Sequence, residues 1–230
     1  NYGYISLNDN SPIELKSEDE SNRLFIQLYD YASSQIPLEN RQVLEVGSGR
    51  GGGASFVARY YNPKSITGLD YSSSAIDLSN KIHSNISNLK FIKGDAENLP
   101  FDDNTFESVI NVESSHCYGN MKSFLKEVHR VLKKGGHFSW VDLRGKDMIK
   151  DTESAFNELD FECINEQTIT PEVLEGLDGI HERKIEMIKL HVPKILQPAF
   201  KDFAGVKNSK IYNAFIDGSA VYLAKAFQKI

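Results

Sequence analysis

The stretch VLEVGSGRGGGAS, Val43–Ser55, joins a short apolar strand to a glycine-rich turn that leads into a predicted helix. Glycines let the backbone approach a ligand closely and adopt positive φ angles. The start of a helix offers free N–H groups, which is the arrangement of a pyrophosphate site. Glu45 lies two residues before the first glycine, and its carboxylate would repel a phosphate. The stretch therefore favours a cationic amine, a sulfonium, or water beneath an amino-acid ligand; a tight turn without a ligand is the alternative.

Short apolar strands alternate with amphipathic helices on both sides of this turn, which is the pattern of a parallel sheet covered by helices on both faces. The predicted strands are Gln42–Val46, Ser65–Leu69, Leu89–Lys93, Phe106–Asn111 and His137–Val141, and the predicted helices between them are Ala54–Tyr60, Ser73–Lys81 and Met121–Lys133. Ligands of such sheets bind beyond the carboxyl ends of the strands. The polar clusters of this sequence lie at those ends.

Beyond Asp142 the pattern continues with fewer strands. We expect strands at Phe161–Gln167 and Ser219–Gln228, which complete a Rossmann-like, seven-stranded, mostly parallel α/β sheet. A mainly helical cap, residues 170–217, is inserted before the last strand. The cap is rich in apolar residues: Leu177, Ile180, Met187, Ile188, Leu190, Val192, Ile195, Leu196 and Phe200. They predict either a hydrophobic substrate pocket or packing of the cap on the sheet.

The composition narrows the class of protein. The chain has 230 residues, 40% of them hydrophobic, which suits a single domain with one sizeable core. Its net charge of −6 and the lack of a dense Lys/Arg run argue against a nucleic-acid partner. No stretch approaches the roughly 18 uncharged apolar residues of a membrane span, and no secretory signal is visible. Two cysteines, Cys117 and Cys163, form neither a disulfide framework nor a metal spacing, so we expect a cytoplasmic protein.

Two acidic residues follow the second and third predicted strands. Asp70 comes about 20 residues after the glycines, where an acid can hold the two hydroxyls of a ribose; capping of the next helix is the alternative. Asp95 lies in KGDAENLPF, Lys93–Phe101. There it can accept a hydrogen bond from an adenine amine while the backbone N–H of Ala96 faces a ring nitrogen. An Asx-turn after the strand is the alternative.

Together these motifs resemble the class I S-adenosylmethionine-dependent methyltransferases. The resemblance runs from about Gln42 to Asp142 and rests on VLEVGSGRGGG, GLDYS, GDAENLPF, FESVINVESSHC and RVLKKGGHFSWVD. It implies an antiparallel last strand, S-adenosylmethionine as cofactor and S-adenosylhomocysteine as product. The cofactor-binding residues that it implies are Glu45, Gly47, Ser48 and Gly49 for the methionine part, Asp70 for the ribose, Asp95 and Ala96 for adenine, and Asn111 for the methionine end. We expect Tyr71, beside Asp70, to be a further cofactor-binding residue.

Within that family the chain is similar to small-molecule methyltransferases that act on sugars and on phthiotriol-type lipids. The shared stretch is NVESSHCY, Asn111–Tyr118, followed by Asp142 after the next strand. In the sugar enzymes a His that matches His116 acts as base and an Asp that matches Asp142 assists it, but a second His often stands where this chain has Cys117. The opening NYGY resembles their N-terminal lid motif, so we expect residues 1–35 to form a lid and helix, with Tyr4 at the cofactor.

Elementary chemistry independently favours His116 as a catalytic base. Methyl transfer from a sulfonium is an in-line displacement, so alignment is the main requirement. An aliphatic hydroxyl is a poor nucleophile and profits from a base with a pKa near ~6.5. Asp142 leaves the neighbouring strand and can orient the imidazole and stabilise its cationic form. The alternative is that His116 packs in a loop and Asp142 closes a turn.

The sequence thus predicts a methyltransferase that O-methylates a hydroxyl of a hydrophobic small molecule, such as a natural product, polyketide or lipid, without a metal. N- or C-methylation stays open because the cofactor site does not determine the acceptor. A catalytically silent cofactor-binding scaffold, an NAD or NADP enzyme, RNA or protein methylation, and a metal site of the catechol type at Asp142 and Asp147 also stay open. The oligomeric state is not predicted.

Overall fold

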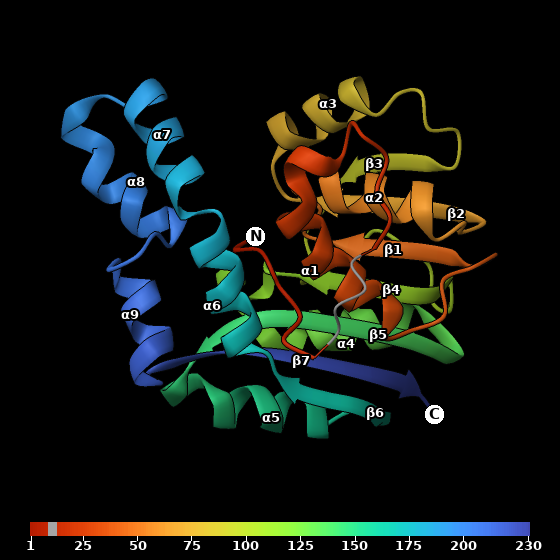
Figure 1. Cartoon of the computed structure of the whole chain (residues 1–230). Coiled ribbons are helices and arrows are strands. Elements are labelled where there is room, and N and C mark those ends of the chain that lie inside the picture. The colour runs from red at the N-terminus through yellow and green to blue at the C-terminus, as the bar shows by residue number, and fades with distance from the viewer. Residues whose placement is uncertain (9–12) are drawn as a thin grey trace. The chain divides into compact units, whose positions relative to one another are not determined.

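A computed structural model describes residues 1–8 and 13–230 and contains a seven-stranded sheet of order β3-β2-β1-β4-β5-β7-β6 (Figure 1). The strands are β1 (Gln42–Val46), β2 (Ser65–Asp70), β3 (Leu89–Lys93), β4 (Phe106–Val112), β5 (Leu132–Gly145), β6 (Phe161–Thr168) and β7 (Ala220–Lys229). β2 and β3 are added on one side of β1, and β4 and the later strands are added on its other side, so the strand order reverses between β1 and β4. The predicted Rossmann-like, mostly parallel sheet is confirmed.

The register of the parallel strands places the strand ends beside one another. β1 pairs with β2 on one side and with β4 on the other, where Glu45 lies opposite Ile110. β4 pairs in parallel with β5, and Val112 lies opposite Val141. The carboxyl ends of β1, β4 and β5 therefore meet at one edge. In Figure 1 the arrow of β7 points against that of β5, as the resemblance implied.

The helices among the described residues are α1 (Arg23–Ser34), α2 (Gly52–Tyr60), α3 (Ser73–Ile82), α4 (Met121–Val131), α5 (Ile149–Asn157), α6 (Thr170–Gly179), α7 (His181–His191), α8 (Gln197–Ala204) and α9 (Lys210–Asp217). Side-chain caps start several of them, as expected of Ser and Asn. Ser72 Oγ accepts from Ala75 N at the start of α3, and Asn120 Oδ1 accepts from Ser123 N at the start of α4.

The predicted end of α4 was wrong. The helix ends at Val131 rather than Lys133, and Gly135 and Gly136 lie inside β5 instead of stopping the helix. The backbone N–H groups of Asn104 and Thr105, in the loop just before β4, donate to the carbonyls of Arg130 and Val131. These bonds satisfy carbonyls that a longer helix would use, so the chain turns directly into an extended strand at Leu132. β5 is accordingly longer than the predicted His137–Val141.

The chain divides into two compact units. Unit 1 comprises Asn1–Leu28, Leu143–Lys146 and Thr168–Leu223, and unit 2 comprises Tyr29–Asp142, Asp147–Gln167 and Ala224–Ile230. In unit 1, Tyr4 N donates to Leu24 O at 3.0 Å and Ile5 N donates to Glu172 O at 3.1 Å. These bonds tie the N-terminal segment to α1 and α6.

Aromatic side chains build the core of unit 2. The rings of Phe156 and Phe227 stack with centroids 4.6 Å apart, and Trp140 packs edge-on against Phe156 at 5.3 Å. Trp140 and Phe138 are fully buried. This core lies along β5, β7 and α5, and it holds rigid the strand that carries Asp142. In the part of the chain that the structure describes, no helix has both the length and the apolar character needed to cross a membrane.

Candidate active site

A histidine just after β4 meets an aspartate of β5 in unit 2. His116 lies on a short 3-10 turn, Ser115–Cys117, that begins three residues after the last residue of β4, and Asp142 is the last of five consecutive buried residues of β5. His116 Nδ1 lies 2.7 Å from Asp142 Oδ1. Asp142 Oδ2 accepts from Ser115 Oγ at 2.6 Å and from the backbone N–H of His116 at 2.9 Å. Both carboxylate oxygens therefore hold the turn that carries the imidazole.

The two side chains of this pair differ in their exposure to solvent. The Asp142 side chain is fully buried, whereas 31% of the His116 side chain is exposed. Trp140 Nε1 donates to Ser115 Oγ at 2.8 Å and so aims the serine hydroxyl at Asp142. Because an ionised carboxylate only accepts hydrogen bonds, Nδ1 is the protonated nitrogen of a neutral His116 ring and the lone pair resides on Nε2. The arrangement can take up a proton at Nε2 and stabilise the resulting cation.

Glu45 is buried in the middle of the sheet at the end of β1. Its Oε1 accepts from the hydroxyl of Tyr29 at 2.7 Å, and its Oε2 has no hydrogen-bond partner in the structure. Burial raises the pKa of Glu45 from its ordinary 4.5 to about 7, although the hydrogen bond from Tyr29 opposes the shift. Burial, together with the charge of Glu45, also raises the pKa of Tyr29 well above its usual value. A buried carboxylate with one unpaired oxygen suits a cationic ligand.

Asn111 connects β1 to the loop after β4. Its Nδ2 donates to Val46 O at 3.0 Å and to Ser114 Oγ at 2.8 Å, and lies 3.1 Å from the hydroxyl of Tyr118. Its Oδ1 is buried without a partner. A Cβ on Gly47 would lie 2.3 Å from Ser114 Oγ, and Gly47 has φ +76°. Only glycine therefore fits at this point of the turn.

The backbone also bends sharply in this loop. Glu113 adopts φ +48°, which is unusual for a residue with a side chain. Its N–H donates to Val141 O at 2.8 Å, and this bond continues the pairing of β4 with β5 by one residue. The bend at Glu113 turns the following serines and His116 across the ends of the strands. Strain of this kind is typical of functional sites.

Asp70 closes the glycine turn from β2. Its Oδ2 accepts from Gly49 N at 2.7 Å, and its Oδ1 accepts from Ser72 N at 2.9 Å. Each oxygen keeps a second lone pair that a ligand hydroxyl can use. The space beside Gly49 is open, since a Cβ built there meets no heavy atom within 4 Å. Tyr71, the next residue, is 76% exposed.

The loop after β3 is folded as an Asx-turn. Asp95 Oδ1 accepts from Glu97 N at 2.9 Å, and Ala96 is buried. This is the turn that the sequence left open for Asp95, and it leaves the second carboxylate oxygen available to a ligand.

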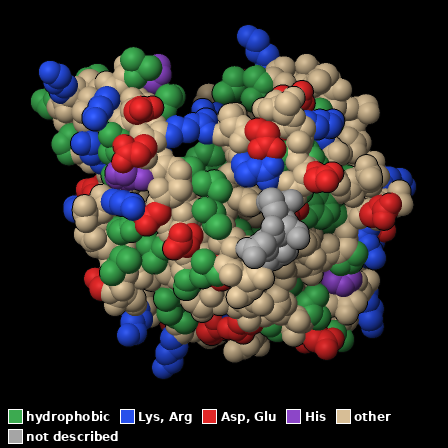
Figure 2. All heavy atoms as spheres, in the orientation of Figure 1, with side chains coloured by type: hydrophobic (Ala, Val, Ile, Leu, Met, Phe, Trp, Pro, Cys, Tyr) green, Lys and Arg blue, Asp and Glu red, His purple; other side chains and the backbone are tan. Residues whose placement is uncertain are grey.

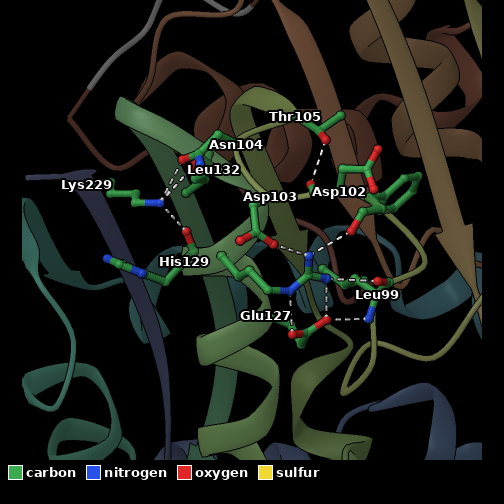
Figure 3. A network of polar contacts seen from close by, with 11 residues as sticks. Leu99, Asp102, Asp103, Asn104, Thr105, Glu127, His129, Leu132 and Lys229 are labelled. Carbon is green, nitrogen blue, oxygen red and sulfur yellow. Dashed lines mark hydrogen bonds and ion pairs between the residues drawn. The ribbon is translucent and has the colours of Figure 1, made fainter.

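α4 holds this loop in place. Glu127 Oε2 accepts from Leu99 N at 2.7 Å, while Arg130 donates to Leu99 O at 2.9 Å and to Phe101 O at 2.7 Å (Figure 3). Hydrogen bonds from Arg130 to Glu127 keep the pKa of this carboxyl below its ordinary value. The loop that carries Asp95 and Ala96 is therefore fixed by two charged side chains of one helix.

Unit 2 contains all but one of the predicted site residues. Among them the direct contacts are His116 with Asp142 and Asp70 with Gly49. Tyr4 lies in unit 1, where its side chain is buried, and its predicted place at the cofactor stays a prediction. Among the described residues, no three His, Cys, Asp or Glu side chains are arranged to hold a metal ion.

The residues fit the amino-acid end of S-adenosylmethionine. Three of the predicted cofactor-binding residues each bury a polar atom that has no hydrogen-bond partner among the described residues: Glu45 Oε2, Ser48 Oγ and Asn111 Oδ1. The carboxylate and amide oxygens only accept hydrogen bonds, whereas the hydroxyl can also donate one. Together they can accept from an ammonium group and donate to a carboxylate, which are the two charged groups of a free amino acid.

Sequence reasoning missed the residues that support the site. They are Tyr29, Ser114, Ser115, Tyr118, Glu127, Arg130 and Trp140. The serines and Tyr118 belong to the quoted NVESSHCY stretch, so the density of polar residues there was a usable signal. Tyr29, by contrast, lies on α1 in an ordinary amphipathic pattern, and nothing local marks it as a donor to Glu45.

Comparison with known proteins shows the family of the chain. The profile of the methyltransferase-domain family matches residues 44–140. A phthiotriol/phenolphthiotriol dimycocerosates methyltransferase of Mycobacterium tuberculosis is 39% identical over 94% of this chain and 80% of its own length. A fatty-acid O-methyltransferase of Mycolicibacterium smegmatis is 39% identical over 88% of this chain and 72% of its own.

A solved structure shares the fold at low sequence identity. It is the geranyl diphosphate C-methyltransferase of Streptomyces coelicolor A3(2) in complex with Mg²⁺, geranyl diphosphate and S-adenosyl-L-homocysteine. It superposes with a TM-score of 0.74 at 15% identity and covers 99% of this chain and 92% of its own.

Proposed function

Since the chain belongs to the S-adenosylmethionine-dependent methyltransferase family, we propose that it transfers a methyl group to a hydroxyl of a hydrophobic small molecule or lipid. The observation that carries this proposal is the 2.7 Å contact between His116 Nδ1 and the fully buried Asp142. A methyltransferase that acts on an anionic oxygen has no need of a base, whereas a neutral hydroxyl profits from one. The pair is the kind of device that such an acceptor requires.

The proposed cofactor site is assigned residue by residue. Glu45, Gly47, Ser48, Gly49 and Asn111 would hold the amino-acid part, and the unpaired atoms of Glu45, Ser48 and Asn111 support this. When bound, S-adenosylmethionine supplies an electrophilic methyl group on a sulfonium.

The nucleoside part would lie along the ends of β2 and β3. Asp70 and Tyr71 would take the ribose, with the second lone pairs of Asp70 as acceptors. Asp95 and Ala96 would flank the adenine in the loop that α4 holds.

In the proposed reaction the protein aligns the acceptor and moves one proton. Asp142 fixes the imidazole so that Nε2 receives the hydroxyl proton as the acceptor oxygen becomes the nucleophile. The positive charge that develops on His116 is stabilised by the buried carboxylate, and Ser115 and Trp140 keep that carboxylate in position. Ser115 and Trp140 act through Asp142 and are therefore positioning residues.

The relatives support a lipid-like acceptor. Their names refer to phthiotriol dimycocerosates and to a fatty acid. A second candidate is therefore the carboxylate of a fatty acid, favoured by the relative named fatty-acid O-methyltransferase. A carboxylate is already anionic near neutral pH, so its methylation would not depend on His116. Methylation of nitrogen or carbon, or a silent scaffold, would leave the two oxygen acceptors unmodified.

A helical cap at residues 170–217 and an N-terminal lid at residues 1–35 remain part of the proposal. What supports them is the cap's apolar content and the hydrogen bonds that tie Tyr4 and Ile5 to α1 and α6 within unit 1. Tyr4→Phe keeps the ring that packs in unit 1 and removes only the hydroxyl. If Tyr4 serves the cofactor, this variant raises the KM for S-adenosylmethionine at an unchanged melting temperature.

Single-turnover transfer from methyl-labelled S-adenosylmethionine tests the proposal. A long-chain alcohol and the fatty acid of equal chain length serve as paired acceptors for the wild type, His116→Ala and Cys117→Ala. Cys117 is the exposed neighbour of His116 and provides the matched control. Hydroxyl O-methylation predicts transfer to the alcohol that only His116→Ala loses. If only the fatty acid is methylated, and at the same rate in His116→Ala as in the wild type, the second candidate replaces the proposal.

A further inference from the structure

One face of unit 1 exposes an unusual number of large apolar side chains. It is formed by α7, the 3-10 turn Lys194–Leu196 and α8, and we call it the α7–α8 face. Its exposed apolar residues are Met187, Leu190, Ile195, Leu196, Phe200 and Phe203. Ile195 is 89% exposed, Phe203 83% and Leu190 75%. Single exposed apolar residues are ordinary, but a contiguous group of this size marks an interaction surface.

The sequence spacing places these side chains together. Leu196, Phe200 and Phe203 are separated by four and three residues, so they share one side of α8. The turn before α8 presents Ile195 at its tip. Beside this face lies an open groove of about 230 Å³ lined by Phe25, Ile180, Met187, Ile188 and Ala204, with Arg183 and Lys184 at its wall. Met187 belongs to both, so the groove continues the face.

The same segment is basic in an acidic protein. α7, the turn and α8, residues 181–204, contain five Lys and Arg residues against three acids, a net charge of +2 in a chain whose net charge is −6. The cations are Arg183, Lys184, Lys189, Lys194 and Lys201. Figure 2 shows Lys and Arg side chains interspersed with hydrophobic ones over α7 and α8, at the upper left. Charge and apolar exposure thus coincide on one surface.

We infer that the α7–α8 face docks on the surface of an anionic phospholipid bilayer. Phe203, Ile195 and Leu190 enter the boundary between headgroups and acyl chains, and the lysines contact lipid phosphates, as in interfacial amphipathic helices. The charge favours this occupant over a second copy of the chain, because two such basic faces would repel each other. The groove can accept part of an acyl chain from the bilayer. Docking goes beyond the proposed reaction and does not depend on the identity of the acceptor.

Sedimentation with vesicles tests the docking without cofactor or acceptor. The full chain is mixed with vesicles of phosphatidylcholine alone or of equal parts phosphatidylcholine and phosphatidylglycerol, at low and high salt. We expect binding to the mixed vesicles that weakens as salt screens the lysines. Lys194→Ala and Lys201→Ala should each weaken binding roughly fivefold. Ile195→Glu and Phe203→Glu should each weaken it roughly tenfold or more.

Ile82→Glu is the matched control. Ile82 is a 52% exposed apolar residue at the end of α3 in unit 2, and its substitution should leave vesicle binding unchanged. Because Ile195 and Phe203 are almost fully exposed, their variants should melt at the wild-type temperature; Ile195→Ser and Phe203→Ser replace them if they do not.

Two results would overturn the inference. One is that the wild-type protein binds vesicles that contain phosphatidylglycerol no more strongly than vesicles of phosphatidylcholine alone. The other is a dimer that Phe203→Glu dissociates while vesicles bind neither form, which would assign the face to a second copy.

Discussion

His116 Nδ1 lies 2.7 Å from Asp142 Oδ1, and the second oxygen of the same carboxylate accepts the backbone N–H of His116. Asp142 therefore holds both the ring and the main chain of one residue. Two contacts of this kind restrict the rotation of the imidazole about the turn. If His116 is the proposed base, this geometry sets the direction of its ring before any substrate arrives.

The first prediction concerns this pair. His116→Ala should lower kcat for a hydroxyl acceptor by about 10²–10⁴ with little loss of cofactor affinity. Asp142→Asn should act on the same step, so the double variant should be little slower than His116→Ala alone. The measurement is single-turnover methyl transfer by variants whose circular dichroism matches the wild type. Additive losses in the double variant would show that the two residues work separately.

The second prediction is a pH dependence set by Glu45. Its pKa is about 7 in the folded chain and 4.5 ordinarily, so the folded state binds this proton more tightly than the unfolded state. The resulting stability, on the order of 3 kcal/mol, is fully present below about 4.5 and is lost as the pH rises through 7. Urea unfolding of the ligand-free protein between pH 4.5 and 8 measures it. Glu45→Gln should remove this component, and a variant with the wild-type slope would contradict the prediction.

The third prediction applies the same titration to the cofactor. A cationic ligand favours ionised Glu45, so its affinity should rise with pH up to about 7, by up to about tenfold per pH unit. The difference between the wild type and Glu45→Gln isolates this effect from the ligand's own titration. Tyr29→Phe removes a donor that stabilises the carboxylate and should move the midpoint to higher pH. Calorimetric titration with S-adenosylhomocysteine is the measurement.

The fourth prediction concerns Asp70. Asp70→Ala should weaken the binding of S-adenosylmethionine by roughly 1.5–3 kcal/mol, the range for a hydrogen bond to a charged group. Asp77→Ala, an exposed acid on α3, is the control and should bind as the wild type does. Because Asp70 also accepts from Gly49 N and Ser72 N, the melting temperature must be recorded beside the calorimetry. Unchanged affinity in a folded Asp70→Ala protein would remove the ribose role.

The fifth prediction concerns the clamp between α4 and the loop after β3. Arg130→Met removes the donors to Leu99 O and Phe101 O and leaves Glu127 without its ion pair. We expect a loss of roughly 1–3 kcal/mol in the free energy of unfolding and weaker cofactor binding. Lys126→Ala, which changes an exposed side chain of α4, should change neither. Hydrogen exchange at the amide of Leu99 reports directly on the loop and should accelerate only in the Arg130 variant.

The alternation of apolar strands and amphipathic helices was sufficient to predict the sheet. Burial on both faces requires apolar runs, and the glycine turn after β1 requires residues that tolerate positive φ. Both features can therefore be recognised in a short stretch of sequence. The acids Asp70, Asp95 and Asp142 were predictable for the same reason, since each comes at the carboxyl end of an apolar run that forms a strand. The end of α4 was not, because its last carbonyls are satisfied by Asn104 and Thr105 from a loop far along the chain.

The working geometry of the site depended on contacts between distant segments. Parallel pairing of Val112 with Val141 brings His116 to Asp142 across 26 residues. Packing of α1 on the sheet brings Tyr29 to Glu45, and α4 brings Arg130 to Leu99. A strand pattern states which residues are buried but not which polar partner meets them. Strand register and helix packing determine those partners. They therefore also determine the pKa of Glu45 and the direction of the His116 ring.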